Sequence, residues 1–270
     1  MAWRDLEKGE EEKALAYVRK EPEINLFISG DLLAFGLDGK HVRARIEEKE
    51  GRFAGILLRY MNRNYVYYTE EEDFPAEEIA HFIKEENPTL QGVCLSGKSA
   101  LIERVAPFLR PLSLEQTMMA RAWCEAPLPK TPKGASVRFL TKKAEFEEAY
   151  DLESTIQEFV SFSKDKEETV DGFLANHKRG SLMIGVYEGG CLVALASTTA
   201  DTAESAMLVG VCTKEGYRKK GYASLAVGSL LQKCHEKGQR FVCLFYDNPL
   251  AGRIYHAFGF VDIAPYSLLH

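Results

Sequence analysis

Three prolines and one glycine stand within nine residues near the middle of the chain, in the segment Ala126–Gly134. Proline fixes φ and removes a backbone donor, so a segment of this kind connects elements and does not form one. The chain has 270 residues, and a single core rarely grows much beyond about 250 residues. We therefore expect two domains, residues 1–126 and 135–270, joined by a linker at 127–134.

The composition is that of an ordinary globular protein, with 46% hydrophobic and 27% charged residues. The net charge is −6 and the longest basic cluster is Arg218–Lys220, which argues against nucleic acid as a partner. Apolar stretches fall short of the ~18 residues that a membrane helix needs, and the first residues lack an apolar signal-peptide core. The six cysteines form no Cys-x-x-Cys pair, which favours buried free thiols over disulfides or zinc. We expect a soluble cytoplasmic protein without a metal and without a membrane or nucleic-acid partner.

Hydrophobic periodicity predicts a mixed α/β fold in each half. In the first half we expect helices at 10–20, 76–86 and 98–109, strands at 42–48, 52–61, 64–69, 92–95 and 115–123, and an irregular segment at 25–36. In the second half we expect helices at 143–159, 222–237 and 250–258, and strands at 136–140, 182–188, 191–198, 206–213, 241–246 and 260–267.

The two halves share a short sequence pattern. Val93-Cys94-Leu95 recurs as Val242-Cys243-Leu244 at an offset of 149 residues, and Leu101 and Arg104 recur at the same offset. Both copies lie in an expected strand-to-helix unit. Two interpretations remain open: a degenerate duplication, or two unrelated units that share common apolar residues.

The segment Val211–Ser224 is the most informative part of the chain, because it leaves an apolar strand, passes Gly216 and Gly221, and enters an amphipathic helix. A tight turn of this kind aims several backbone N–H groups outward at the positive end of a helix, where they bind phosphate. A triphosphate-binding P-loop needs Lys-Ser/Thr after its last glycine, but here Tyr222-Ala223 follow, and a Gly-x-Gly-x-x-Gly fingerprint is also absent. From the loop alone two interpretations stay open: a diphosphate held without a metal, or an ordinary turn with solvated basic residues.

Two motifs in this half resemble those of the GNAT N-acetyltransferase superfamily. Arg218-x-x-Gly221-x-Ala223, placed after Val211-x-Thr213, is similar to its coenzyme A loop. Asn248-x-x-Ala251-x-x-x-Tyr255-x-x-x-Gly259-Phe260 is similar to the motif that follows. The resemblance covers about 135–270 and implies two tandem GNAT-like domains, of which the second holds acetyl-CoA. The first would be a degenerate copy, because no Arg-x-x-Gly-x-Ala loop occurs before residue 130.

The resemblance also implies roles for individual residues. Backbone N–H groups from 218 to 224 would wrap the pyrophosphate, and an N–H near Val209–Val211 would polarise the thioester oxygen. Asn248 would bind the pantetheine arm, with a simple helix N-cap as the alternative. The implied cofactor-binding residues are Val209, Val211, Cys212, Thr213, Arg218, Lys219, Lys220, Gly221, Tyr222, Ala223, Ser224 and Asn248.

Proton transfer needs an acid and a base. Tyr255 is the expected acid, since the departing thiolate needs a proton, and a packed core tyrosine is the alternative. Met207 stands where some family members carry the base, so the base stays open among Glu204, which we take first, Glu153 and Glu158.

We expect an acetyl-CoA-dependent N-acetyltransferase that acetylates a primary amine of a small molecule or peptide by direct attack in a ternary complex. The rival hypothesis is a sensor that binds coenzyme A and transfers nothing. Two roles stay open for the first half: it walls the acceptor site, or it forms the contact of a homodimer.

Overall fold

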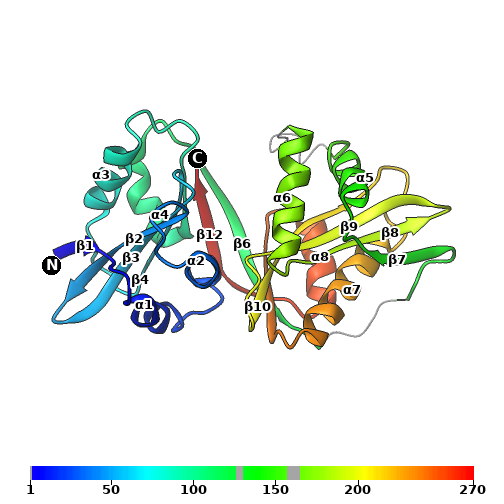
Figure 1. Ribbon diagram of the computed structural model, residues 1–270, viewed down its shortest axis with the longest axis horizontal. Coiled ribbons are helices and arrows are strands. Elements are labelled where there is room, and N and C mark those ends of the chain that lie inside the picture. The colour runs from blue at the N-terminus through cyan, green and yellow to red at the C-terminus, as the bar shows by residue number, and fades with distance from the viewer. Residues whose placement is uncertain (1, 126–129, 157–164) are drawn as a thin grey trace. The chain divides into compact units, whose positions relative to one another are not determined.

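The computed structural model describes residues 2–125, 130–156 and 165–270, which form two compact units (Figure 1). The first unit contains the residues up to Ala120 together with Phe245–Asp247 and Asp262–His270, and the second contains Arg121–Leu244 and Asn248–Val261. The last strand of the chain thus belongs to the first unit, although the sequence places it in the domain 135–270. Positions 127–129 of the expected linker lie outside the described residues.

The first unit is a mixed sheet with helices packed on it. Its elements are β1 (Ala2–Asp5), α1 (Glu11–Val18), α2 (Leu26–Phe35), β2 (Val42–Lys49), β3 (Arg52–Tyr60), β4 (Asn64–Thr69), α3 (Ala76–Glu86), β5 (Cys94–Lys98), α4 (Ser99–Val105), the 3₁₀ helix η1 (Ala106–Leu109), β6 (Leu114–Trp123), which enters the second unit at Arg121, and β12 (Val261–Leu269). The strand order is β1-β2-β3-β4-β5-β12-β6. Strands β1 to β4 form an antiparallel meander, β5 is parallel to β4, and β12 is antiparallel to β5.

The second unit has the same kind of sheet. Its elements are β7 (Ala135–Phe139), α5 (Lys143–Glu153), α6 (Lys166–Lys178), β8 (Met183–Glu188), β9 (Cys191–Thr199), β10 (Ser205–Thr213), α7 (Tyr222–Glu236), β11 (Phe241–Tyr246), whose last two residues belong to the first unit, and α8 (Pro249–Ala257). The strand order is β11-β10-β9-β8-β7. Strands β7 to β10 form an antiparallel meander, and β11 is parallel to β10.

The units therefore repeat one topology: a four-stranded meander, a helix, and a fifth strand parallel to the fourth. In each unit the fifth strand pairs with the fourth over three residues: 64–66 with 94–96 in the first unit, and 205–207 with 241–243 in the second. The repeated topology favours duplication over chance.

Each unit has its own core. In the second unit, α5 and α6 pack on one face of the sheet, where Phe146, Val170 and Leu195 are buried together. Helix α7 lies on the other face and buries Leu225 and Leu230 (Figure 1). Each such side chain contributes about 1.5–3 kcal/mol when fully buried. The core of the first unit holds residues of β3 to β5, α3 and α4, and also Leu269 of β12.

Three elements were not predicted: β1, α2 and α6. Residues 25–36, expected to be irregular, contain α2, in which apolar residues fill most positions and hide any helical period. Helix α6 buries Val170 alone among its residues, so it has no apolar stripe. Its N-cap Asp165 accepts hydrogen bonds from the N–H groups of Glu167 and Glu168, a local signal that could have revealed the helix.

Four of the six cysteines are buried free thiols, as expected, whereas Cys94 is half-buried and Cys191 is exposed. Among the described residues, no helix is long and apolar enough to cross a membrane. The same residues contain no group of three or more His, Cys, Asp or Glu side chains that could hold a metal ion.

Candidate active site

Strands β10 and β11 of the second unit part after their first three residues. Their parallel pairing runs from Ser205 opposite Phe241 to Met207 opposite Cys243. Strand β10 continues to Thr213 and stays paired with β9. Within these two fully described strands, β10 beyond Met207 has no ladder pairing with β11, so β11 leaves room beside β10 for an extended ligand.

A β-bulge interrupts β10 beside this opening. Val209 pairs with Ser197 and Cys212 with Leu195, which leaves Gly210 and Val211 opposite a single residue of β9. Gly210 has φ 62°, a conformation that favours glycine. The Oγ of Ser197 donates a hydrogen bond to the carbonyl oxygen of Val209 over 3.1 Å and holds the bulge from the neighbouring strand. A bulge re-aims backbone groups out of the ladder, as an oxyanion-binding N–H requires.

The loop from β10 to α7 contains three residues with left-handed backbone conformation. These are Gly216 at φ 82°, Lys219 at φ 63° and Gly221 at φ 88°. Gly221 is the N-cap of α7, and no side chain caps the helix there. The first N–H groups of a helix lack partners within the helix, so the first turn of α7 presents donors and the positive end of the helix dipole.

Side-chain contacts fix the loop at both ends. The hydroxyl of Tyr222, the first residue of α7, donates a hydrogen bond to Glu188 of β8. This hydrogen bond to a carboxylate is the main reason why the pKa of Tyr222 rises to about 12. The Nε of Arg218 donates to the carbonyl oxygen of Thr213 at 3.3 Å, and the ammonium of Lys220 lies 5.0 Å from the ring centre of Tyr217.

Three consecutive cations, Arg218, Lys219 and Lys220, are exposed on this loop. Their charge and the open helix end act in the same direction, because both stabilise a bound anion. The loop thus has the donors and the charge that a diphosphate requires, and it contains no carboxylate between Arg218 and Ser224.

Asn248 and Tyr255 lie on α8. The Oδ1 of Asn248 accepts a hydrogen bond from the N–H of Leu250 at 2.9 Å, so this side chain is an N-cap, as the alternative interpretation expected. The side chain of Tyr255 is 8% exposed, and its ring meets Phe260 edge-on at 5.8 Å. Burial raises the pKa of Tyr255 to about 12.

The candidate bases occupy different places. Glu204 is exposed and precedes β10, six residues before Gly210, which along a strand corresponds to about 20 Å. Glu153 ends α5 beside the bulge: a methyl group added to Gly210 would lie 3.0 Å from its Oε1. Burial raises the pKa of Glu153 to about 7. Glu158 lies outside the described residues. The structure therefore brings Glu153, but not Glu204, to the bulge.

Residues 146–260 match the model of the acetyltransferase (GNAT) family. The second half of this chain carries a GNAT acetyltransferase domain. The match includes the bulge, the loop and both sequence motifs, and the family implies acetyl transfer that depends on acyl-CoA. A comparison with curated proteins gives no match.

Solved structures extend the likeness to the first unit. A GCN5-related N-acetyltransferase from Sphaerobacter thermophilus has a TM-score of 0.69 at 13% identity, over 99% of this chain and 94% of that one. A tandem GNAT protein from the clavulanic acid biosynthesis pathway has a TM-score of 0.63 at 12% identity, over 99% and 97%. A GCN5-related N-acetyltransferase from Kribbella flavida has a TM-score of 0.62 at 18% identity, over 91% and 95%. At these identities the likeness concerns the fold: the chain has two tandem GNAT-like units.

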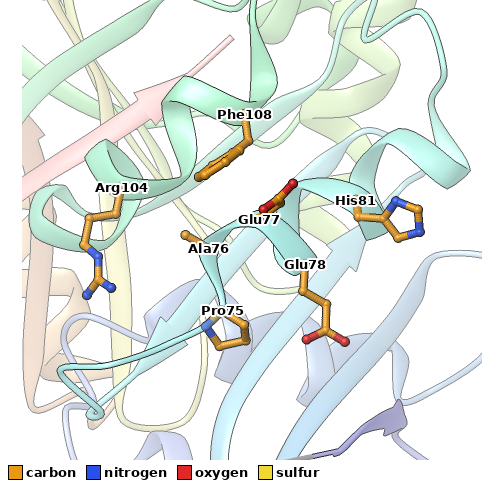
Figure 2. Close-up of a pocket in the computed structure, with 7 residues that line it drawn as sticks. All are labelled: Pro75, Ala76, Glu77, Glu78, His81, Arg104 and Phe108. Atoms are coloured by element: carbon orange, nitrogen blue, oxygen red, sulfur yellow. The ribbon is translucent and has the colours of Figure 1, made fainter.

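The first GNAT-like unit differs from the second at the place that matters for a diphosphate. The loop between β4 and α3 corresponds to the loop before α7, and it reads Glu70-Glu-Glu-Asp-Phe-Pro75. A hollow of about 730 Å³ lies at the start of α3, lined by Pro75, Ala76, Glu77, Glu78, His81, Arg104 and Phe108 (Figure 2). Carboxylates at this helix start would repel a phosphate group.

The positions that correspond to the second motif have also changed in the first unit. At the offset of 149, Asn248 corresponds to Ser99 and Tyr255 to Ala106. The hydroxyl of Ser99 shares a 2.7 Å hydrogen bond with that of Ser267, a buried contact within the first unit. Neither the loop nor the helix therefore preserves the groups of the second GNAT unit.

Sequence reasoning found the loop of the GNAT domain but missed two supports of the site. Ser197 holds the bulge and Glu188 anchors Tyr222. Both partners are distant in sequence, and hydroxyl or carboxylate side chains within strands carry no spacing rule.

Proposed function

We propose that the second unit transfers an acetyl group from acetyl-CoA to a primary amine of a small molecule or peptide, by direct attack in a ternary complex. The observation that supports this most is the uncapped start of α7 at Gly221, with left-handed Gly216 and Lys219 before it. An anion is the natural occupant of such a helix end.

The cofactor would lie along the loop and the free edge of β10. Backbone N–H groups of residues 218–224 would hold the pyrophosphate, with Arg218, Lys219 and Lys220 adding charge. The backbone of Val211, Cys212 and Thr213 would pair with the pantetheine arm, as an added strand does. The N–H groups at the bulge, from Val209 to Val211, would polarise the thioester oxygen, a role typically worth about 3–4 kcal/mol. The exposed amide of Asn248 is left for the pantetheine, since its oxygen caps α8.

Tyr255 would stabilise the departing thiolate. Its pKa of about 12 exceeds the ~8.5 of an ordinary thiol by about 3.5 units, so full proton transfer is uphill by roughly 5 kcal/mol. A hydrogen bond to the developing thiolate avoids most of this cost and is worth about 1.5–3 kcal/mol. We therefore propose that Tyr255 acts as a hydrogen-bond donor at the sulfur.

The test is thiol release from acetyl-CoA by the full chain, measured with a panel of primary amines and short peptides. We expect release that depends on the acceptor, with acetylated amine identified by mass spectrometry. Tight binding of coenzyme A without release by any acceptor would favour the sensor and contradict the transferase.

The number of cofactors per chain is a second measurement. The acidic loop Glu70–Asp73 of the first unit predicts that the full chain binds one coenzyme A in a calorimetric titration. Two molecules bound per chain would contradict this distinction between the units.

A further inference from the structure

The bulge of β10 brings a buried carboxyl group and a hydroxyl group to one point of the second unit. A methyl group added to Gly210 would lie 2.8 Å from Oγ of Ser197 and 3.0 Å from Oε1 of Glu153. The two oxygens therefore flank the residue whose backbone leaves the ladder. Glu153 reaches this point from the last turn of α5, and Ser197 from the neighbouring strand β9.

A small pocket adjoins the same residues. It has a volume of about 70 Å³ and is lined at the bulge by Ser197 and Val209. Its remaining lining is in part apolar, with Phe146, Phe173 and Met183, and in part polar, with Asn176, His177 and Thr198. The ring of Phe146 lies 6.1 Å from that of Phe173 and 5.9 Å from that of His177. Two members of the pocket, Ser197 and Val209, thus also belong to the bulge where Glu153 lies.

The surroundings of Glu153 leave its carboxyl group poorly solvated. Burial raises the pKa of Glu153 to about 7. Titratable side chains in the core and pocket beside α5 include His177 on α6, Cys212 on β10 and Tyr187 on β8. The charged Lys166 and Asp171 of α6 pair with Asp151 and Lys143 of α5. A carboxyl group of this kind changes protonation near neutral pH, which suits a general base.

We propose that Glu153 is the general base of the acetyl transfer and that the aromatic pocket receives the apolar part of a small amine. This inference rests on the proposed function. The carboxylate of Glu153 takes a proton from the acceptor ammonium. The amine nitrogen then forms a bond to the thioester carbon and the carbon–sulfur bond breaks, so that the thiolate leaves toward Tyr255. The second proton of the attacking nitrogen passes to the thiolate, which gives the neutral amide and coenzyme A, and Glu153 returns its proton to solvent.

The lining of the pocket selects the class of acceptor. Phe146, Phe173 and Met183 favour an apolar or aromatic group on their side of the pocket, which also has polar walls, and the volume of about 70 Å³ accommodates only a small group. Glu153 attracts the ammonium end of the same molecule. We therefore infer that a small aralkyl amine is a better acceptor than a polar amine of similar basicity.

The pairwise comparison of acceptors uses 2-phenylethylamine and ethanolamine as probes, with acetyl-CoA and the full chain. We expect kcat/KM to be about tenfold or more higher for 2-phenylethylamine. Equal values, or a preference for ethanolamine, would overturn the pocket assignment.

The role of Glu153 is tested with Glu153→Gln, which keeps the shape and removes the charge. We expect kcat/KM to fall by about 10²-fold or more, while the dissociation constant of coenzyme A is unchanged. In the wild type, kcat/KM for the most active amine should rise with pH to a plateau above an apparent pKa near 7. Glu153→Gln should lose this limb and keep only the titration of the amine itself.

A matched control lies on the same helix. Asp151 is exposed and forms an ion pair with Lys166, so Asp151→Asn should leave both the rate and the pH profile unchanged. If Glu204→Gln lost the rise of kcat/KM near pH 7 while Glu153→Gln kept it, the general-base role of Glu153 would be overturned and the proposed function would stand. No acetylation of any amine by the wild type would instead overturn the proposed function, and this role with it.

Discussion

Replacing Gly221 by valine tests whether the conformation of the loop before α7, and not the stability of the fold, determines the affinity for coenzyme A. Gly221 has φ 88° at the start of α7, and Gly238 has φ 83° just after its end. The left-handed conformation costs an ordinary L-residue about 1–2 kcal/mol and a β-branched residue more. An added Cβ would meet only Cγ of Pro132, at 3.7 Å, at position 221, and nothing within 4 Å at position 238. Both Gly221→Val and Gly238→Val should therefore fold, with a loss of stability no larger than this strain.

The affinity for coenzyme A should differ between the two variants. At position 221 the backbone relieves its strain by leaving the conformation that aims the N–H groups at the diphosphate. Binding must then restore that conformation, so the 1–2 kcal/mol reappears as an approximately 5- to 30-fold weaker dissociation constant. At position 238, on the far end of the helix, the dissociation constant should not change.

The assay is calorimetric titration of the wild type and both variants with coenzyme A, alongside urea unfolding of each protein. The unfolding data establish that both variants are folded. Wild-type affinity in Gly221→Val, or equal weakening in Gly238→Val, would refute the argument that the loop conformation binds the diphosphate.

Three further predictions concern the acid, the last strand and a buried carboxyl group. Tyr255→Phe should lower kcat by about 10- to 100-fold, the value of a hydrogen bond to a charged atom, while the affinity for coenzyme A stays unchanged. An unchanged kcat in stopped assays of thiol release would exclude Tyr255 as the hydrogen-bond donor to the departing sulfur. Tyr266→Ala should destabilise the first unit by about 3–5 kcal/mol, because Tyr266 is buried there against Phe245. If the backbone amides of β5 were as well protected from hydrogen exchange in this variant as in the wild type, the prediction would be wrong. Burial is the main cause that raises the pKa of Glu47, so the wild type loses stability as pH rises from the unfolded pKa near ~4.5 to the raised folded value. In urea unfolding, Glu47→Gln should be more stable than the wild type at pH 8 but not at pH 4. An equal difference at both pH values would disprove the linkage.

Local patterns predicted most strands and helices of the chain. The boundaries of β4, α3 and β11 agree residue for residue with the expectation, because proline or turn residues such as Asn62, Pro75 and Asp247 stand beside them in the sequence. Helices α2 and α6 were missed because one is apolar at most positions and the other buries a single residue. Their stability comes from tertiary packing and capping, which a window of hydrophobicity does not register.

The candidate site was predictable where backbone conformation dictates residue type. Gly216 and Gly221 stand at left-handed positions, so the loop left a signal in the sequence. Glu153 had no such signal: it lies 57 residues before Gly210 and meets it only through the packing of α5 on the sheet. The choice between Glu153 and Glu204 depended on distance in space, which the sequence does not contain.

Because β12 belongs mainly to the first unit, that unit cannot complete its sheet until the second unit has been synthesised. A polypeptide emerges from the ribosome with its N-terminal end first, so β1 to β6 are synthesised long before residues 262–270. Until those residues arrive, the edge of β5 that pairs with Tyr266–Leu269 has unsatisfied backbone donors and acceptors, and edges of this kind promote aggregation. Nascent chains interrupted between Trp123 and Asp262 should therefore depend on chaperones more than the finished protein does, even though most of the first unit has already been translated.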